Sequence, residues 1–148
     1  MSYIKFYESL FDMPVGFTGN QQGMTPQQIS ALTQTLKKLG ATAFHHGDCI
    51  GSDNEAHTVA QGLNIPVILH PPINASKRAW SKGAVEERDE KEYLARNQDI
   101  INETKALIGT PRGFKEVQRS GTWSTIRRGK KTGKPVYIIW PDGVVEKQ

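Results

Sequence analysis

Short apolar runs alternate with stretches of helical periodicity along most of the chain. In the segment 25–39, apolar residues recur at spacings of three and four, which is typical of one buried helix face. These residues are Ile29, Leu32, Leu36 and Leu39. Thr25 and Gln28 have the spacing of a capping box, and Gly40 is a stop signal. The pattern therefore predicts a helix over this segment.

The same reading predicts three more helices and five strands. Ser52 and Glu55 form a second capping-box pattern, ahead of an apolar stripe made of Ala56, Val59, Ala60 and Leu63. Two further helices are predicted over 89–104 and 122–131. The first of these directs four residues inward: Tyr93, Leu94, Ile100 and Ile101. The predicted strands cover 15–18, 41–46, 66–70, 106–109 and 135–140.

Regular alternation of strands and helices is typical of the α/β class. It predicts a doubly wound, mainly parallel five-stranded sheet with right-handed crossovers, a Rossmann-like architecture. The run PVILH at 66–70 is apolar throughout, which favours a strand covered on both faces. The length of 148 residues fits a single domain over 1–148, with its core at about 15–140. The long segment 71–83 is predicted as a loop.

Composition narrows the class without naming a function. The single cysteine excludes a disulfide framework and a cysteine-rich zinc module. The chain has no apolar run of about 18 residues, so we expect no membrane span. Residues 1–11 contain Glu8 and lack an unbroken apolar stretch, so we expect no signal peptide and a cytoplasmic location. The net charge of +4 permits an anionic partner without requiring one.

The segments that follow the predicted strands are the places to look for a site, because open α/β sheets bind ligands at the carboxyl ends of their strands. Here these segments are TGNQQG, HHGDCIGSD, HPP and TPRGFKEVQRSGT. Glycine allows close backbone approach, and a helix N-terminus suits a phosphate. Ser120, Gly121 and Thr122 lead into the last helix and can bind a ligand or cap the helix. Trp123 can stack on a base or belong to the core.

Several histidines and acids near the second strand raise the question of a metal site. They are His45, His46, Asp48, Asp53 and His57. Neighbouring strand residues point to opposite faces, so His45 and His46 do not converge on one ion. We therefore predict no metal. Cys49 has no partner base at a recognisable spacing, and we interpret it as a small filler residue.

The segment 112–134 is strongly basic, with eight basic residues and one acid, whereas the rest of the chain is net acidic. We interpret 127–134 as a solvated helix face with cations at its C-terminal end. Arg112 and Arg119 lie nearer the predicted site and could contact a ligand phosphate. Binding of DNA or RNA through this charge is an alternative function.

Four segments, in their order along the chain, resemble the SLOG superfamily of DprA-like, LOG-like and small YspA-like Rossmann proteins. They are VGFTGNQQG, HHGDCIGSD, YLARNQDIINETKALIGTP and SGTWSTIRRGKKTGKPVYII, spanning about Val15 to Trp140. The resemblance implies a fold that binds nucleotides or nucleotide-derived ligands. Some members cleave the N-glycosidic bond of cytokinin nucleotides, whereas others sense nucleotide signals or bind DNA. The resemblance also implies self-association.

The resemblance and the strand-end loops together give a set of predicted ligand-binding residues. They are Gly19, Asn20, Gln21, Gly47, Asp48, Gly51, Ser52, Asp53, Arg96, Asn97, Thr110, Pro111, Ser120, Gly121, Thr122 and Trp123. We expect a nucleotide as the ligand and no further cofactor. The leading hypothesis is a nucleotide sensor or sequestering module.

One departure from the family bears on catalysis. LOG-type enzymes carry PGG-x-GT-x-x-E, and Thr125 stands here in place of the catalytic glutamate. A hydroxyl does not replace a carboxylate in activating water. A nucleotide N-glycosidase or hydrolase therefore remains an alternative only if another carboxylate acts, and Asp48 and Asp53 are the candidates.

Overall fold

A computed structural model describes residues 12–148 of the chain. Residues 1–11, and with them the prediction that this segment is no signal peptide, lie outside the described residues. Within 12–148, no helix combines the length and the apolar character needed to cross a lipid bilayer.

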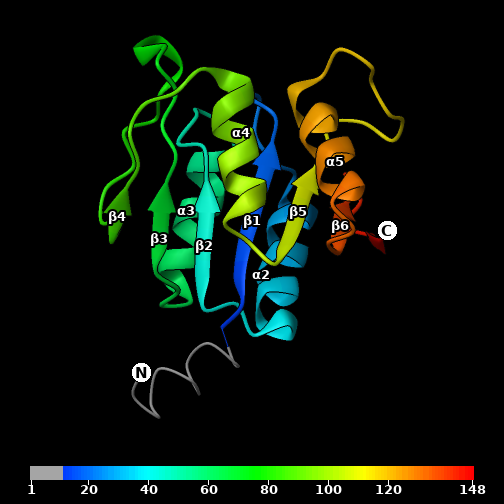
Figure 1. Cartoon of the computed structure of the whole chain (residues 1–148). Coiled ribbons are helices and arrows are strands. Elements are labelled where there is room, and N and C mark those ends of the chain that lie inside the picture. Colours follow the sequence, from blue (N-terminus) through cyan, green and yellow to red (C-terminus); the bar gives the residue numbers. More distant parts are fainter. Residues whose placement is uncertain (1–11) are drawn as a thin grey trace.

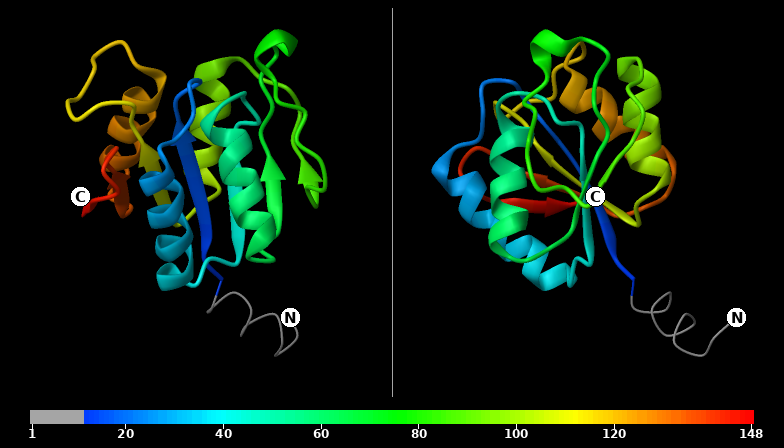
Figure 2. Two further views of the ribbon diagram at one scale, coloured as in Figure 1. Left: turned by 180° about the vertical axis from the view of Figure 1, so that it is seen from behind. Right: turned by 90° about the vertical axis from the view of Figure 1, so that its left-hand side faces the viewer.

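Seven strands form one sheet in the order β4-β3-β2-β1-β5-β6-β7, and only β7 runs antiparallel to its neighbour. The strands are β1 (Pro14–Gly19), β2 (Ala43–His46), β3 (Val67–Leu69), β4 (Glu86–Glu87), β5 (Ala106–Thr110), β6 (Val136–Ile139) and β7 (Val145–Lys147). The helices are α2 (Pro26–Leu39), α3 (Ser52–Gly62), α4 (Tyr93–Asn102) and α5 (Gly121–Lys131), with a short 3-10 helix η1 (Ala75–Lys77). The pairs α2/α3 and α4/α5 cover opposite faces of the sheet (Figures 1 and 2). The predicted doubly wound α/β fold is thus confirmed.

The predicted count of five strands is wrong, because β4 and β7 were missed. β4 is two exposed glutamates, too short and too polar to show a strand pattern. β7 is exposed along its whole length and lies beyond the core boundary predicted near residue 140. Both strands lie at the edges of the sheet, where the backbone pairs without burying an apolar face.

Of the two capping boxes predicted from the sequence, one is present in the structure and the other is not. Thr25 and Gln28 form the predicted capping box at α2. The capping box predicted at Ser52 is wrong, since Gly51 is the N-cap of α3 and makes no side-chain cap. Gly51 has a φ of 91°, a conformation that favours glycine. Glu55 instead accepts a hydrogen bond from the Met24 N–H at 2.6 Å, which ties α3 to the loop after β1.

The inward face of α4 is shifted from the predicted one. Ile100 and Ile101 are buried as predicted, but Tyr93 and Leu94 are exposed. Arg96 and Asn97 take their place on the buried side of the first turns. A buried arginine and asparagine have no apolar signature, so periodicity alone assigned this turn incorrectly.

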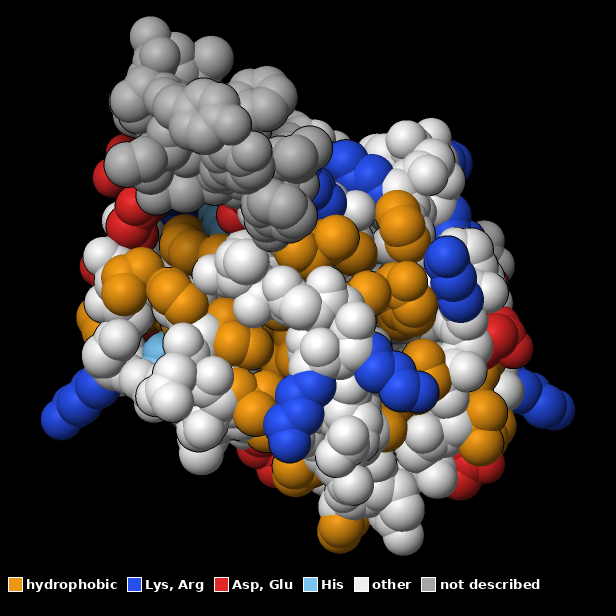
Figure 3. Space-filling view, turned by 90° about the horizontal axis from the view of Figure 1, so that it is seen from below, with side chains coloured by type: hydrophobic (Ala, Val, Ile, Leu, Met, Phe, Trp, Pro, Cys, Tyr) orange, Lys and Arg blue, Asp and Glu red, His pale blue; other side chains and the backbone are white. Residues whose placement is uncertain are grey.

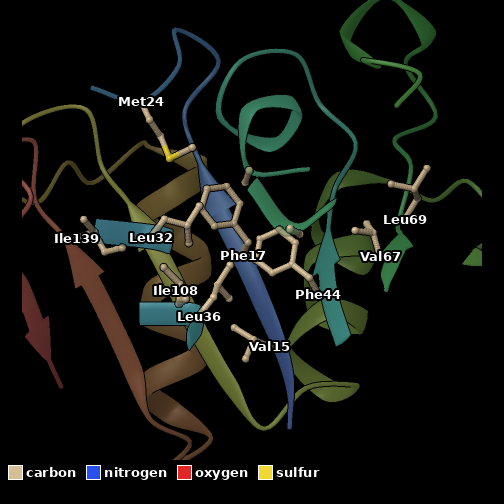
Figure 4. Packing of buried hydrophobic residues seen from close by; sticks show 12 residues of the cluster. Val15, Phe17, Met24, Leu32, Leu36, Phe44, Val67, Leu69, Ile108 and Ile139 are labelled. Atoms are coloured by element: carbon tan, nitrogen blue, oxygen red, sulfur yellow. The ribbon is translucent and has the colours of Figure 1, made fainter. Parts of the chain in front are cut away.

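The main core lies between the sheet and the α2/α3 pair. Phe17 of β1 packs against Phe44 of β2 with ring centroids 5.6 Å apart. Leu32 and Leu36 of α2 close over these rings, and Ile108 of β5 extends the same layer (Figure 4). This rigid layer holds the carboxyl ends of β1, β2 and β5 side by side (Figure 1).

Candidate functional site

A cleft lies at the carboxyl ends of the central strands, where open α/β sheets bind their ligands. It consists of three adjoining cavities of about 340, 200 and 40 Å³, and Gln21 and Tyr93 line all three. The largest continues outward to Pro72, Ile73, Asn74, Lys77, Lys91 and Glu92. The combined space is in the range of small-ligand pockets, roughly 300–1,000 Å³.

Unpaired polar atoms surround the turn that ends β1. The Asn20 side-chain nitrogen and the hydroxyls of Ser52 and Thr110 are buried without a hydrogen-bond partner among residues 12–148. A Cβ on Gly19 would stand 2.6 Å from the Thr110 hydroxyl and 2.4 Å from the Ser52 Cβ, so only glycine allows this close approach. Buried polar groups are nearly always satisfied in native proteins, so the turn is suited to an acceptor-rich ligand or to water.

The start of α5 opens onto the 200 Å³ cavity through Ser120, Gly121 and Thr122. The Ser120 hydroxyl accepts a hydrogen bond from the Trp123 N–H at 3.3 Å and caps the helix. The N–H groups of Gly121 and Thr122 have no partner inside the helix, as is general for a first helical turn. They and the positive end of the helix dipole favour an anion at this end of the cleft.

Arg96 is a buried cation beneath the cleft. Its side chain donates hydrogen bonds to the carbonyl oxygens of Gly47 at 2.6 Å and His70 at 3.1 Å. It also donates to the Asn97 side chain at 2.7 Å, and its guanidinium lies 5.1 Å from the centre of the Tyr93 ring. Arg96 therefore fixes the ends of β2 and β3 to α4 and adds positive charge to the floor of the cleft.

Asp53 is a buried carboxylate that borders the cleft. Burial raises the pKa of Asp53 to about 6, and the positive charge of Arg96 and the Cys49 N–H, 3.1 Å away, only partly oppose that shift. The group is therefore poised to change protonation near neutral pH, a property found at many catalytic sites. Burial likewise raises the pKa of the Cys49 thiol, which keeps it protonated at neutral pH.

The long segment between β3 and α4 is fixed to the rest of the molecule by a buried ion pair. Asp48 is fully buried and accepts from Arg78 Nε at 2.9 Å and from the Ser81 N–H at 3.0 Å. Arg78 also pairs with Glu87 at 2.6 Å and packs over Trp80 at 3.9 Å. These contacts fix residues 71–83 as one wall of the cleft.

A relay of two histidines supports the same wall. His46 Nε2 and His57 Nδ1 lie 2.9 Å apart, with the rings edge to face. The Asp48 N–H donates to His46 Nδ1 at 2.9 Å, and His57 Nε2 lies 2.7 Å from the Lys82 carbonyl. Burial lowers the pKa of His46 well below its usual value, so His46 is neutral at neutral pH. All four ring nitrogens of the two histidines have hydrogen-bond partners.

Searches with the sequence and with the structure gave different results. No protein-family model matches the sequence, and no curated protein matches it significantly. A molybdenum cofactor binding protein from the phototrophic bacterium Rippkaea orientalis superposes with a TM-score of 0.64 at 20% identity, covering 87% of this chain and 77% of that one. The Moco carrier protein from Chlamydomonas reinhardtii gives 0.62 at 19% identity, covering 86% and 75%.

DNA processing protein A (DprA) from Streptococcus pneumoniae gives a TM-score of 0.64 at 17% identity, covering 88% of this chain and 51% of that one. The chain has the Rossmann-like fold of these proteins, as its resemblance to the SLOG superfamily predicted. The likeness establishes the fold alone, and the use of the cleft has to be argued from the residues of this chain.

Ten of the residues predicted to bind a ligand line the cavities of the cleft: Gly19, Asn20, Gln21, Gly47, Asp53, Arg96, Asn97, Ser120, Gly121 and Thr122. Six others do not line them: Asp48, Gly51, Ser52, Thr110, Pro111 and Trp123. Ser52 and Thr110 lie directly behind Gly19, whereas the Asp48 carboxylate forms a buried ion pair with Arg78. Of the two candidate catalytic carboxylates, only Asp53 borders the cleft.

Trp123 and Thr125, two residues singled out from the sequence, have structural roles. Trp123 is 3% exposed and packs against Trp140 with ring centroids 5.7 Å apart, so it belongs to a second core cluster. Thr125 is buried, and its hydroxyl donates to the Gly121 carbonyl at 3.0 Å. The position of the LOG-type glutamate thus holds a side chain that stabilises the first turn of α5.

Tyr93 lines the cleft but is absent from the ligand-binding residues predicted from the sequence. The residue is 45% exposed and borders all three cavities of the cleft. It was interpreted as a core residue because its spacing matches the apolar stripe of the helix. The usable signal was the pair Tyr93 and Arg96, an aromatic and a cation three residues apart at a helix start.

The basic segment 112–134 is largely outside the cleft. Arg127 pairs with Glu116 at 2.8 Å, and Lys134 donates to the Ile101 carbonyl. Arg112 and Arg119 are exposed and line none of the three cleft cavities. On the opposite edge of the molecule, visible basic side chains are scattered among apolar ones (Figure 3).

Proposed function

We propose that the chain binds a nucleotide or nucleotide-derived small molecule in the cleft, as a sensor or sequestering module. The observation that carries the proposal is the convergence of three features on one cleft. These are the free N–H groups at the start of α5, the buried Arg96 cation and the half-exposed Tyr93 ring. An anion and an adjoining flat ring are the ligand parts that such a cleft recognises.

The structural neighbours support a ligand-carrying role for this fold. Two of them are named for binding or carrying the molybdenum cofactor, and a third, from Helicobacter pylori, for a mode of single-stranded DNA binding. All of these ligands contain phosphate and a ring system. A phosphate at α5 with a ring against Tyr93 is consistent with that shared chemistry.

Thermal-shift and calorimetric titrations test the proposal. The panel contains inorganic phosphate, mononucleotides, dinucleotides and cyclic nucleotides. At least one member should raise the melting temperature of the wild-type protein and bind with 1:1 stoichiometry. Tyr93→Ala should weaken that binding, whereas Lys38→Ala, in a separate hollow between α2 and β7, should leave it unchanged. No binding by any member of the panel would refute the proposal.

A second candidate function is nucleotide hydrolysis or N-glycosidic cleavage, and the position of Asp53 favours it. This carboxylate borders the cleft, and its pKa of about 6 suits a general acid or base near neutral pH. Incubation with nucleotides followed by chromatography tests turnover. The hypothesis predicts released base or phosphate from the wild-type protein. It also predicts loss of turnover with retained binding in Asp53→Asn.

Nucleic-acid binding has less support from the charges. The cations of 112–134 that pair with Glu116 or with carbonyl groups are not free to neutralise phosphates. Binding of single-stranded DNA that falls steeply with salt would nevertheless favour this alternative. The self-association implied by the resemblance is tested separately by light scattering at several protein concentrations.

A further inference from the structure

Two histidines and a glutamate meet on the α4 face of the sheet, outside the cleft. His45 lies in β2, His70 follows β3, and Glu103 ends α4. One ligand atom from each lies within 4.8 Å of the other two, and the described residues 12–148 contain one such group. His45 is paired in register with Gly16, which faces α4, and therefore points away from the His46 relay.

The spacing of the two rings suits a metal ion. His45 Nδ1 and His70 Nε2 lie 2.9 Å apart. A tetrahedral ion bound at about 2.0–2.1 Å holds two nitrogen ligands about 3.3 Å apart, so a small opening of the pair admits it. The other ring nitrogen of His70 is buried without a partner among the described residues, so the pair leaves polar capacity unused.

Charge around the cluster also favours a cation. Arg88 donates two hydrogen bonds to the same Glu103 oxygen, at 3.0 and 2.8 Å, and pairs with Glu86 as well. One guanidinium is thus shared by two carboxylates, and the second Glu103 oxygen takes no part in these bonds. The Glu103 side chain is 33% exposed, which gives an ion a route from solvent. Outer contacts of this kind orient metal-binding carboxylates in proteins.

We propose that His45, His70 and Glu103 bind a divalent transition-metal ion such as Zn²⁺, with solvent completing its coordination. Two imidazoles and one carboxylate are a ligand set that Zn²⁺ accepts while keeping an open position. The site goes beyond ligand binding in the cleft. It is connected to the cleft through Arg96, which binds the His70 carbonyl.

The His46–His57 pair is an internal control for this proposal. Its rings are equally close, but every ring nitrogen already has a partner in the relay described above. It also lies outside the metal-ligand group found in residues 12–148. A site that depended only on two adjacent histidines would not distinguish the two pairs.

Metal titration of chelator-treated full-length protein tests the proposal with the metal alone. Co²⁺ should give the visible absorption of a low-coordinate site at one ion per chain, and Zn²⁺ should displace it. His70→Ala should abolish this signal, and Glu103→Gln should weaken binding by about tenfold or more. Glu116→Gln, which alters another exposed Arg–Glu pair, and His57→Ala should bind the ion like wild type.

Absence of stoichiometric binding in the wild type would overturn the proposal. Equal binding by wild type, His70→Ala and Glu103→Gln would overturn it too. If His70→Ala does not fold, Glu103→Gln decides, because its side chain is partly exposed at a helix end. The readout uses no nucleotide, so its result is independent of the function proposed for the cleft.

Discussion

The two walls of the cleft use their polar groups in opposite ways. The closed wall, residues 46–53 and 70–92, holds a buried ion pair, a histidine relay and the Arg96 contacts, and it satisfies most of its polar groups internally. The open wall, residues 19–22 and 120–122, keeps the unpaired Asn20 side-chain nitrogen and a helix start whose first N–H groups have no partner inside the helix. The unpaired Ser52 hydroxyl of the closed wall lies directly behind Gly19, and His70 Nδ1 is the other unpaired buried side-chain atom of that wall among the described residues. Polar residues satisfied within the protein shape the site, whereas unsatisfied ones beside a cavity are left for a ligand.

The largest expected effect comes from breaking the closed wall. Arg78→Ala leaves the Asp48 carboxylate buried without its ion-pair partner, and should lower the free energy of unfolding by about 3–5 kcal/mol. Arg127→Ala removes an exposed pair with Glu116 and should cost less than about 1 kcal/mol. Urea denaturation measures both. Similar losses in the two variants would contradict the role assigned to the buried pair.

Asp53, in the closed wall, should make the free energy of unfolding depend on pH. Its pKa is about 6 in the folded protein and near 3.8 in the unfolded chain, so the unfolded state loses this proton first as pH rises. The contribution of Asp53 to stability therefore falls between about pH 4 and pH 6 and stays low above it, a change of about 3 kcal/mol. Well below pH 4 both states are protonated and no cost remains.

Asp53→Asn removes this titration. Relative to wild type, the variant should become more stable as pH rises from 4 to 7, as measured by denaturation at several pH values. Asp142→Asn, at an exposed position, gives the baseline for an aspartate change. A stability difference between Asp53→Asn and wild type that does not vary with pH would contradict burial as the cause of the raised pKa.

Tyr93 tests whether a ligand binds between the two walls, because its ring faces the cleft from between them. Tyr93→Ala should weaken nucleotide binding by about 1–3 kcal/mol if a base stacks on the ring. Phe114→Ala removes a more exposed ring from the basic segment and should leave the affinity unchanged. Calorimetry measures both affinities. A greater loss of affinity in Phe114→Ala would indicate that the ligand binds to the basic segment and not to the cleft.

The smallest effect belongs to the cap of the open wall. Ser120→Ala removes the hydroxyl that accepts from the Trp123 N–H and should cost about 1 kcal/mol of stability. Thr25→Ala removes the cap of α2, a helix on the opposite face of the sheet from α5 (Figure 2). If the open wall binds an anion, only Ser120→Ala should also change phosphate affinity. Equal phosphate binding by the two variants would argue against a ligand at the start of α5.

The fold was predictable from the sequence because its buried elements have strong periodicity. The spacing of the apolar residues is enough to predict the strand with Val15 and Phe17 and the buried face of α2. β4 and β7 were not predictable because edge strands pair through their backbones and need no apolar side chains.

The cleft was predictable in part. The loops that end parallel strands meet at one edge whatever their composition, so Gly19, Gly47 and Gly121 could be grouped in advance. The role of Asp48 could not, because its partner Arg78 lies 30 residues away in an irregular segment. The position of Tyr93 depends on where α4 begins, which periodicity fixes poorly.

The most direct test of the central claim is an amide ¹H–¹⁵N titration with inorganic phosphate followed by mononucleotides. The account predicts saturable shifts at Gly121 and Thr122 and in the turn 19–22, with further shifts near Tyr93 only when a base is present. Shifts confined to the exposed residues 112–119, or no saturable shift at the start of α5, would contradict it.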